Sequence, residues 1–145
     1  MWWRNVTLIY AVAFTAVGIL GFVPTFLSPP PAGEILIVDT FHGLLLGLFP
    51  VNLMHNIVHL LFGLWAFFAF FSGRLASRAY LKSVAVIYAV LTIMGLIPGL
   101  NTLFGLVPLY GNDIWLHALL AIVAGVVGFG VREPEADTTR AQWHA

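Results

Sequence analysis

Four long stretches without an acidic or basic residue divide the chain. Asp, Glu, Lys and Arg are absent from 5–33, 40–73, 83–112 and 114–131. About 20 apolar residues are enough for a helix to cross the hydrocarbon core of a bilayer, so each stretch can hold one span. Proline and glycine shorten the ends of these stretches. The pattern predicts an all-α integral membrane protein with spans near 5–23, 51–71, 81–97 and 112–130.

The composition agrees with a bilayer as the solvent. Of the 145 residues, 61% are apolar and only 8% are charged, and the mean hydropathy is +0.98. A soluble domain of this size has about 25% charged residues. This excludes a water-soluble enzyme and a nucleic-acid binder with a basic surface. The absence of cysteine excludes a disulfide framework and a thiolate metal site.

The charged residues predict the orientation of the spans. All basic residues fall on one side of the predicted membrane, whereas Glu34, Asp39 and Asp113 fall on the other. The positive-inside rule makes the basic side cytoplasmic. Both termini, including a polar tail over 132–145, are then cytoplasmic, in a bacterial inner membrane or in a thylakoid-type membrane. The basic residues are Arg4, Arg74, Arg78, Lys82, Arg132 and Arg140.

The chain resembles two copies of a helical hairpin. The segment 19–24 (ILGFVP) matches 93–98 (IMGLIP), and 47–50 (GLFP) matches 105–108 (GLVP). The second register places His59 on His117 and His55 on Asp113. Because each copy contains two spans, both enter the membrane in the same orientation. This predicts tandem repeats related by a pseudo-two-fold axis along the membrane normal.

The first copy has additional residues between its two spans. Three consecutive prolines start this insertion, and a short apolar run follows over 33–49. Asp39 or Thr40 could cap a short helix that ends near Leu48. Apolar runs of this length are typical of interfacial or re-entrant segments. We therefore expect a lid on the outer face.

Polar side chains gather on two of the predicted spans. Residues four apart share one face of a helix, and imidazoles or amides that face lipid are costly, so both polar faces should point inward. The cluster therefore lies in the outer half of the bundle. Its members are Asn52, His55, Asn56 and His59 on the second span, and Asn112, Asp113 and His117 on the fourth.

Three interpretations of this cluster remain open. The first is a divalent transition metal bound by His55, His59, Asp113 and His117, with His42 as a further ligand. Around such an ion, Asn52, Asn56 and Asn112 would orient the histidine rings. The second is a b-type haem or a chlorophyll-like pigment on His59 and His117. The third is a structural network in which the histidines hydrogen-bond to amides and backbone.

The residues that form this pattern also resemble a known group of sequences. The segment 48–52 (LFPVN), His55, Asn56, His59 and Gly63, together with 111–113 (GND) and 115–117 (WLH), is similar to an uncharacterised family of small bacterial four-span proteins. That family is known only as a domain of unknown function. The resemblance implies the four-span fold and implies no activity.

The sequence favours a small non-catalytic membrane protein. It has no Ser–His–acid spacing and no glycine-rich phosphate loop, so we expect no enzymatic activity. An auxiliary subunit of a membrane complex, in contact with a membrane-protein partner or a second copy, is the first hypothesis. A cofactor-binding membrane protein is the alternative. An oligomeric transporter or channel is a weaker one, because four spans enclose little space.

Overall fold

The computed structural model describes residues 2–131. Four helices dominate it, and short strands connect the first two. The helices are α1 (Trp2–Leu20), α2 (Leu53–Ser72), α3 (Arg74–Leu96) and α4 (Asn112–Gly125), and α4 continues as the π-helical segment η2 (Val126–Gly130). The connecting elements are the 3-10 turn η1 (Pro24–Phe26) and the strands β1 (Leu27–Ser28), β2 (Gly43–Leu45) and β3 (Phe49–Val51).

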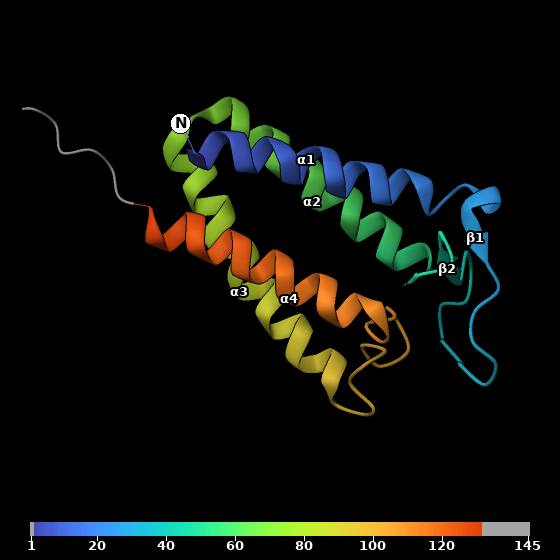
Figure 1. The fold of residues 1–145 in the computed structure, drawn as a ribbon. Coiled ribbons are helices and arrows are strands. Elements are labelled where there is room, and N and C mark those ends of the chain that lie inside the picture. Colours follow the sequence, from blue (N-terminus) through green and yellow to red (C-terminus); the bar gives the residue numbers. More distant parts are fainter. Residues whose placement is uncertain (1, 132–145) are drawn as a thin grey trace, which may run out of the picture.

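The helices form two hairpins that pack into one bundle. α1 packs most extensively against α2, and α3 against α4. The start of α1 and the end of η2 lie at one end of the bundle, and the strands and long loops lie at the other (Figure 1). We call these the basic end and the loop end. All four helices are long and apolar enough to cross a bilayer, which confirms the prediction of four spans.

One helix is longer than predicted. The third span was expected from residue 81, but α3 begins at Arg74, directly after α2 ends at Ser72. Gly73 alone makes the turn, with a φ of 105° that a residue with a Cβ rarely adopts. The basic residues that were expected in a loop therefore lie on the first turns of α3, still at one end of the bundle.

The prediction of a short helix ending near Leu48 is wrong. Residues 43–51 instead form two strands that pair antiparallel with each other, and β1 pairs with β2 in the order β1-β2-β3. Phe41 and Leu46 have φ values of 57° and 53°, which interrupt any right-handed helix. The pairing of Leu27 with Leu45 supplies backbone hydrogen bonds that a helix of this length could not retain alone.

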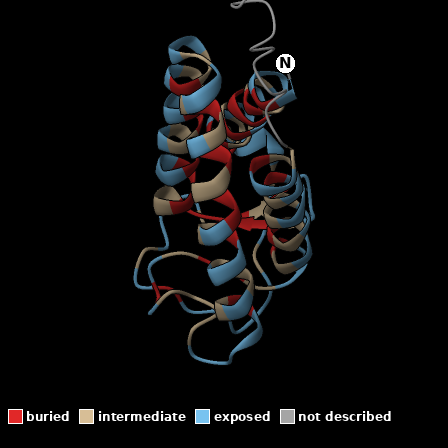
Figure 2. Ribbon diagram, turned by 90° about the vertical axis from the view of Figure 1, so that its left-hand side faces the viewer, coloured by how far each residue is buried: buried red, intermediate tan, exposed pale blue. Residues whose placement is uncertain are grey.

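Buried aromatic side chains fill the middle of the bundle. Phe14 and Tyr88 stack at a centroid distance of 5.4 Å, and both are almost completely buried. Two aromatic groups donate to helix carbonyls, namely the Tyr10 hydroxyl to Leu120 at 2.6 Å and the Trp3 indole to Val127 at 2.9 Å. Such bonds matter in a bilayer, where water does not reach the polar tips. Buried residues line the helix sides that face one another (Figure 2).

The backbone repeats itself locally at the loop end. Leu46 and Gly47 have positive φ, as do Phe104 and Gly105, which stand 58 positions later in the matching motif. In both places the glycine N–H donates to the carbonyl three residues earlier. The same unusual turn thus precedes α2 and α4. The duplication itself and the pseudo-two-fold axis remain predictions.

Candidate metal centre

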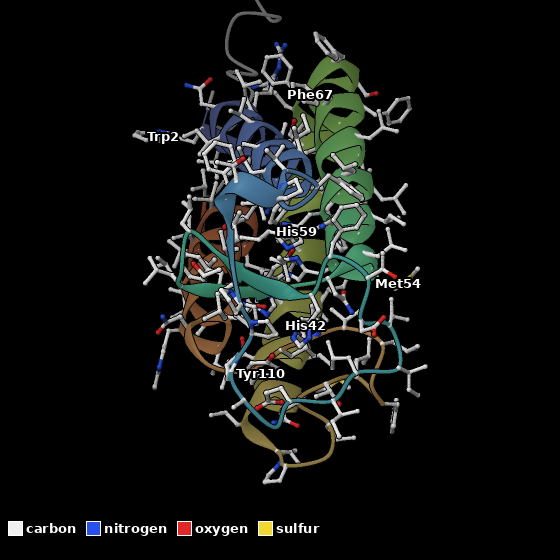
Figure 3. The ribbon with its side chains drawn as sticks, turned by 90° about the vertical axis from the view of Figure 1, so that its right-hand side faces the viewer. Trp2, His42, Met54, His59, Phe67 and Tyr110 are labelled. Atoms are coloured by element: carbon white, nitrogen blue, oxygen red, sulfur yellow. The ribbon has the colours of Figure 1, made fainter. Side chains whose placement is uncertain are left out.

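The polar residues of α2 and α4 meet inside the bundle near the loop end. His55 and His59 lie on the first two turns of α2, and Asp113 and His117 lie on the first two turns of α4. At 1.5 Å per residue, the two deeper histidines are about 8–9 Å from the starts of their helices. All four side chains are at most 5% exposed. Figure 3 shows His59 in the interior of the bundle.

The three histidines converge on a small volume. One ring nitrogen from each of His55, His59 and His117 lies within 4.8 Å of the others. The rings of His55 and His59 stack at a centroid distance of 4.2 Å. Asp113 lies beside two of the three histidines, because its Oδ2 is 3.7 Å from Nε2 of His55 and 3.6 Å from Nε2 of His117. Three imidazoles from two helices therefore converge, with one carboxylate next to two of them.

Several polar atoms of this set have no hydrogen-bond partner. Both ring nitrogens of His55, Nδ1 of His59, Nδ1 of His117 and Oδ2 of Asp113 are buried without one. Each unpaired buried group costs about 1–3 kcal/mol. This arrangement disagrees with the hydrogen-bonded structural network that was one interpretation of the sequence. It is typical of a site whose interactions are completed by a bound species.

The spacing of the atoms suits a metal ion better than a hydrogen bond. The carboxylate–imidazole distances of 3.6 and 3.7 Å exceed those of a hydrogen bond. Two ligands in a tetrahedron around zinc, each about 2.0–2.1 Å from the ion, are separated by about 3.3 Å. The Asp113–His contacts are close to that separation, and the three histidine nitrogens lie within 4.8 Å of one another. Three imidazoles and one carboxylate form a donor set that zinc, copper and nickel accept.

The cavity beside these histidines is small for a macrocyclic cofactor. The cavity beside His55, His59 and His117 has a volume of about 70 Å³, whereas pockets for drug-sized or cofactor-sized molecules have about 300–1,000 Å³. The cavity accommodates an ion with one or two water molecules. This packing favours the ion, and the haem and pigment interpretations of His59 and His117 stay predictions.

Within residues 2–131, none of the three asparagine side chains forms a hydrogen bond with a histidine ring. Asn52 caps α2 through its Oδ1, which accepts from the backbone N–H of His55 at 2.9 Å. Asn56 lies against Gly21, where an added Cβ would overlap its amide. Asn112 is exposed and donates to the carbonyl of Leu48 at 3.2 Å. Asn52 and Asn112 therefore connect helices to loops, whereas both polar side-chain atoms of Asn56 are buried without a partner. The predicted role of the three asparagines in orienting the histidines stays a prediction.

His42 lies outside the histidine cluster. Its Nε2 is 3.0 Å from the hydroxyl of Tyr110, and Figure 3 shows this pair nearer to the loops than His59. Partial burial lowers the pKa of His42 below 6.5, and the carboxylates of Glu34 and Asp39 partly oppose this shift. Burial raises the pKa of Tyr110 to about 12, so its hydroxyl stays protonated. His42 thus connects two loops and is not a fifth ligand.

Two aromatic rings border the cluster and were not singled out from the sequence. The rings of Phe14 and His59 meet edge-on with their centroids 5.3 Å apart, and the rings of Tyr88 and His117 do so with their centroids 4.8 Å apart. Phe14 and Tyr88 are also 74 positions apart, which is the register of the first repeated motif. The register of the repeat therefore pairs Phe14 with Tyr88 and could have identified both residues from the sequence.

Comparison with known proteins assigns no activity to the chain. A family model described as a domain of unknown function, DUF4383, matches residues 4–130. Neither the curated proteins nor the solved structures contain a match. The resemblance to an uncharacterised family is confirmed by this match.

Proposed function

Because the chain belongs to the DUF4383 family, whose description names no activity, we propose its function from the geometry of the site. The protein binds one divalent transition-metal ion within its helical bundle. The ligands are His55, His59, His117 and Asp113. The observation that supports the proposal is the convergence of three histidine nitrogens within 4.8 Å of one another, with the Asp113 carboxylate beside His55 and His117 and with buried polar atoms unpaired.

Charge favours a divalent ion at this position. Neutral imidazoles ligate metals, and Asp113 contributes one negative charge, so the loaded site carries about one net positive charge instead of two. An isolated carboxylate is also costly in an apolar interior, and an adjacent cation offsets that cost. Tetrahedral geometry with nitrogen and oxygen ligands makes Zn²⁺ the first candidate.

The remaining sequence-based hypotheses concern the setting of this site. We propose that the protein has no catalytic activity of its own and serves as an auxiliary subunit, with a membrane-protein partner or a second copy at its apolar helix faces. We place it in a bacterial inner membrane with both termini cytoplasmic, as the distribution of basic residues favours. The loop end, and with it the metal site, then faces the outside.

Elemental analysis of the full chain tests metal binding. The protein is purified in mild detergent, equilibrated with Zn²⁺ and passed through a desalting column. We expect about one zinc ion per chain in the wild type and a loss of bound zinc in His59→Ala and His117→Ala. His42→Ala is the matched control, because it removes a partly buried histidine at the loop end without removing a ligand.

A second measurement keeps the test valid if the alanine variants fold poorly. Co²⁺ in a tetrahedral site of nitrogen and oxygen ligands gives visible ligand-field absorption bands, which can be followed in the intact wild type and displaced by Zn²⁺. Substoichiometric zinc in the folded wild type, together with no cobalt spectrum, would overturn the proposal. An equal loss of metal in His42→Ala would overturn the assignment of the ligands.

A further inference from the structure

A polar groove opens at the basic end, far from the histidines. It is lined by Arg4 and Asn5 from the first turn of α1, Phe70 from the last turn of α2 and Arg74 from the start of α3. Its volume is about 480 Å³. The guanidinium of Arg4 lies 4.7 Å above the ring of Phe70. Three helices thus contribute to one open concave surface with two arginines.

The helix geometry adds to the positive potential of this groove. Both α1 and α3 begin here, and neither has an acidic residue in its first turn. Gly73 precedes α3 and offers no capping side chain. The first N–H groups of a helix lack intrahelical partners and carry partial positive charge. Anions bind favourably at such positions.

The two arginines of the groove differ from their basic neighbours. Arg78 donates from Nε to the carbonyl of Gly128 at 3.1 Å, and the amine of Lys82 lies 5.1 Å above the ring of Phe129. Arg4 also lies over an aromatic ring, that of Phe70, but Arg4 and Arg74 are exposed whereas Arg78 and Lys82 are half-buried. Over residues 2–131, every acidic residue belongs to the loop end: Glu34, Asp39 and Asp113. No carboxylate of this range neutralises the groove.

We propose that this groove binds the phosphate of an anionic phospholipid. Two guanidiniums can hold phosphate oxygens through paired charged hydrogen bonds, and basic pockets between membrane helices suit anionic headgroups. The apolar side chains of Phe71 and Leu75, which follow two of the lining residues in sequence, are 76% and 72% exposed. These side chains provide a surface for the acyl chains of a phospholipid. Free phosphate has no acyl chains and would not use this surface.

Native mass spectrometry of the delipidated full chain tests the site. The protein in detergent is titrated with phosphatidylglycerol, with phosphatidylcholine as the zwitterionic lipid and with inorganic phosphate as the free anion. We expect preferential binding of phosphatidylglycerol and a loss of about tenfold or more in its affinity for Arg4→Gln/Arg74→Gln. Lys82→Gln is the control, since it removes one positive charge from the same end outside the groove.

The outcomes separate the lipid from other anions and from general charge. Arg4→Lys/Arg74→Lys should restore part of the affinity, because the charge returns without the planar fork of donors. Equal losses in Lys82→Gln and the double glutamine variant would overturn the proposal, since they would show nonspecific charge attraction. Displacement of the lipid by inorganic phosphate at similar concentration would overturn the assignment to a lipid. Zinc binding measured on the same variants should stay unchanged, which keeps this test separate from that of the histidine site.

Discussion

Asn52 is a residue whose replacement should cause a large loss of stability that can be worked out from its hydrogen bonds. Its side chain is completely buried. Its Oδ1 caps α2, and its Nδ2 donates to the carbonyls of Val38 at 2.7 Å and Leu106 at 2.8 Å. One amide therefore holds the start of a helix and the two long loops together. The substitution Asn52→Ala removes all three bonds and leaves no replacement of similar geometry.

The expected loss can be estimated from these bonds. A missing cap costs about 1 kcal/mol, and each carbonyl that loses its partner costs about 1 kcal/mol more. The sum is about 3 kcal/mol, against a total of about 5–15 kcal/mol for a folded domain. Asn112→Ala is the matched control, because Asn112 is exposed and makes one bond of 3.2 Å. We expect a cost of about 0.5 kcal/mol or less for this control.

The free energy of unfolding of both variants can be measured on the purified protein in mixed micelles. The fraction of denaturing detergent is raised and tryptophan fluorescence is followed. The zinc-to-protein ratio of folded Asn52→Ala should equal that of the wild type, since no Asn52 side-chain atom bonds to a histidine ring. A loss below about 1 kcal/mol, or one no larger than that of Asn112→Ala, would refute the reasoning. The loops would then be held by contacts other than this amide.

Two further predictions follow from close contacts and from the loop histidine. Gly63→Ala should destabilise the bundle by about 1–3 kcal/mol. The new Cβ would overlap the Thr15 hydroxyl and lie 3.0 Å from the Thr15 backbone nitrogen. Gly130→Ala is the control, because its position has open space, and it should show little change in the same unfolding assay. His42 should titrate below pH 6.5 because burial lowers its pKa. The unfolded chain therefore binds the proton more readily than the folded chain. The contribution of His42 to stability is complete above pH 6.5 and is lost as the pH falls through the folded pKa. NMR of nitrogen-labelled histidines measures the pKa of His42, and the variant Tyr110→Phe tests the contribution of the Tyr110 hydroxyl to it. A titration midpoint at or above pH 6.5 would contradict the burial of the His42 ring.

The features that depend on local composition could be predicted from the sequence. The four spans follow from charge-free apolar stretches. The residues of the histidine cluster follow from helical spacing and from the register of the repeat, which pairs His59 with His117. Both arguments need only neighbours within a few turns, or an internal match along the chain.

The features that depend on distant partners could not be predicted. The strand at 43–45 pairs with the nearby Phe49–Val51 and also with Leu27–Ser28, which lie across a proline-rich loop. Asn52 was expected to orient histidine rings, but its partners are carbonyls 14 and 54 residues away. Helical spacing identified the inward face of α2 and could not tell which inward side chain would meet a loop and which would meet α4.

A layer of buried aromatic side chains lies between the histidines and the basic end of the bundle. Phe14 and Tyr88 border the rings, and Tyr80 continues the buried filling toward the basic end. The cavity beside the histidines is lined by Tyr88 of this layer, by Val58 and Leu91 of the helices, and by Leu103, Val107 and Leu109 of the loop that precedes α4. If an ion binds here, the aromatic layer would separate it from the basic end and leave it nearer to the loop end. We then expect the occupancy of the site to follow the metal concentration in the compartment at the loop end.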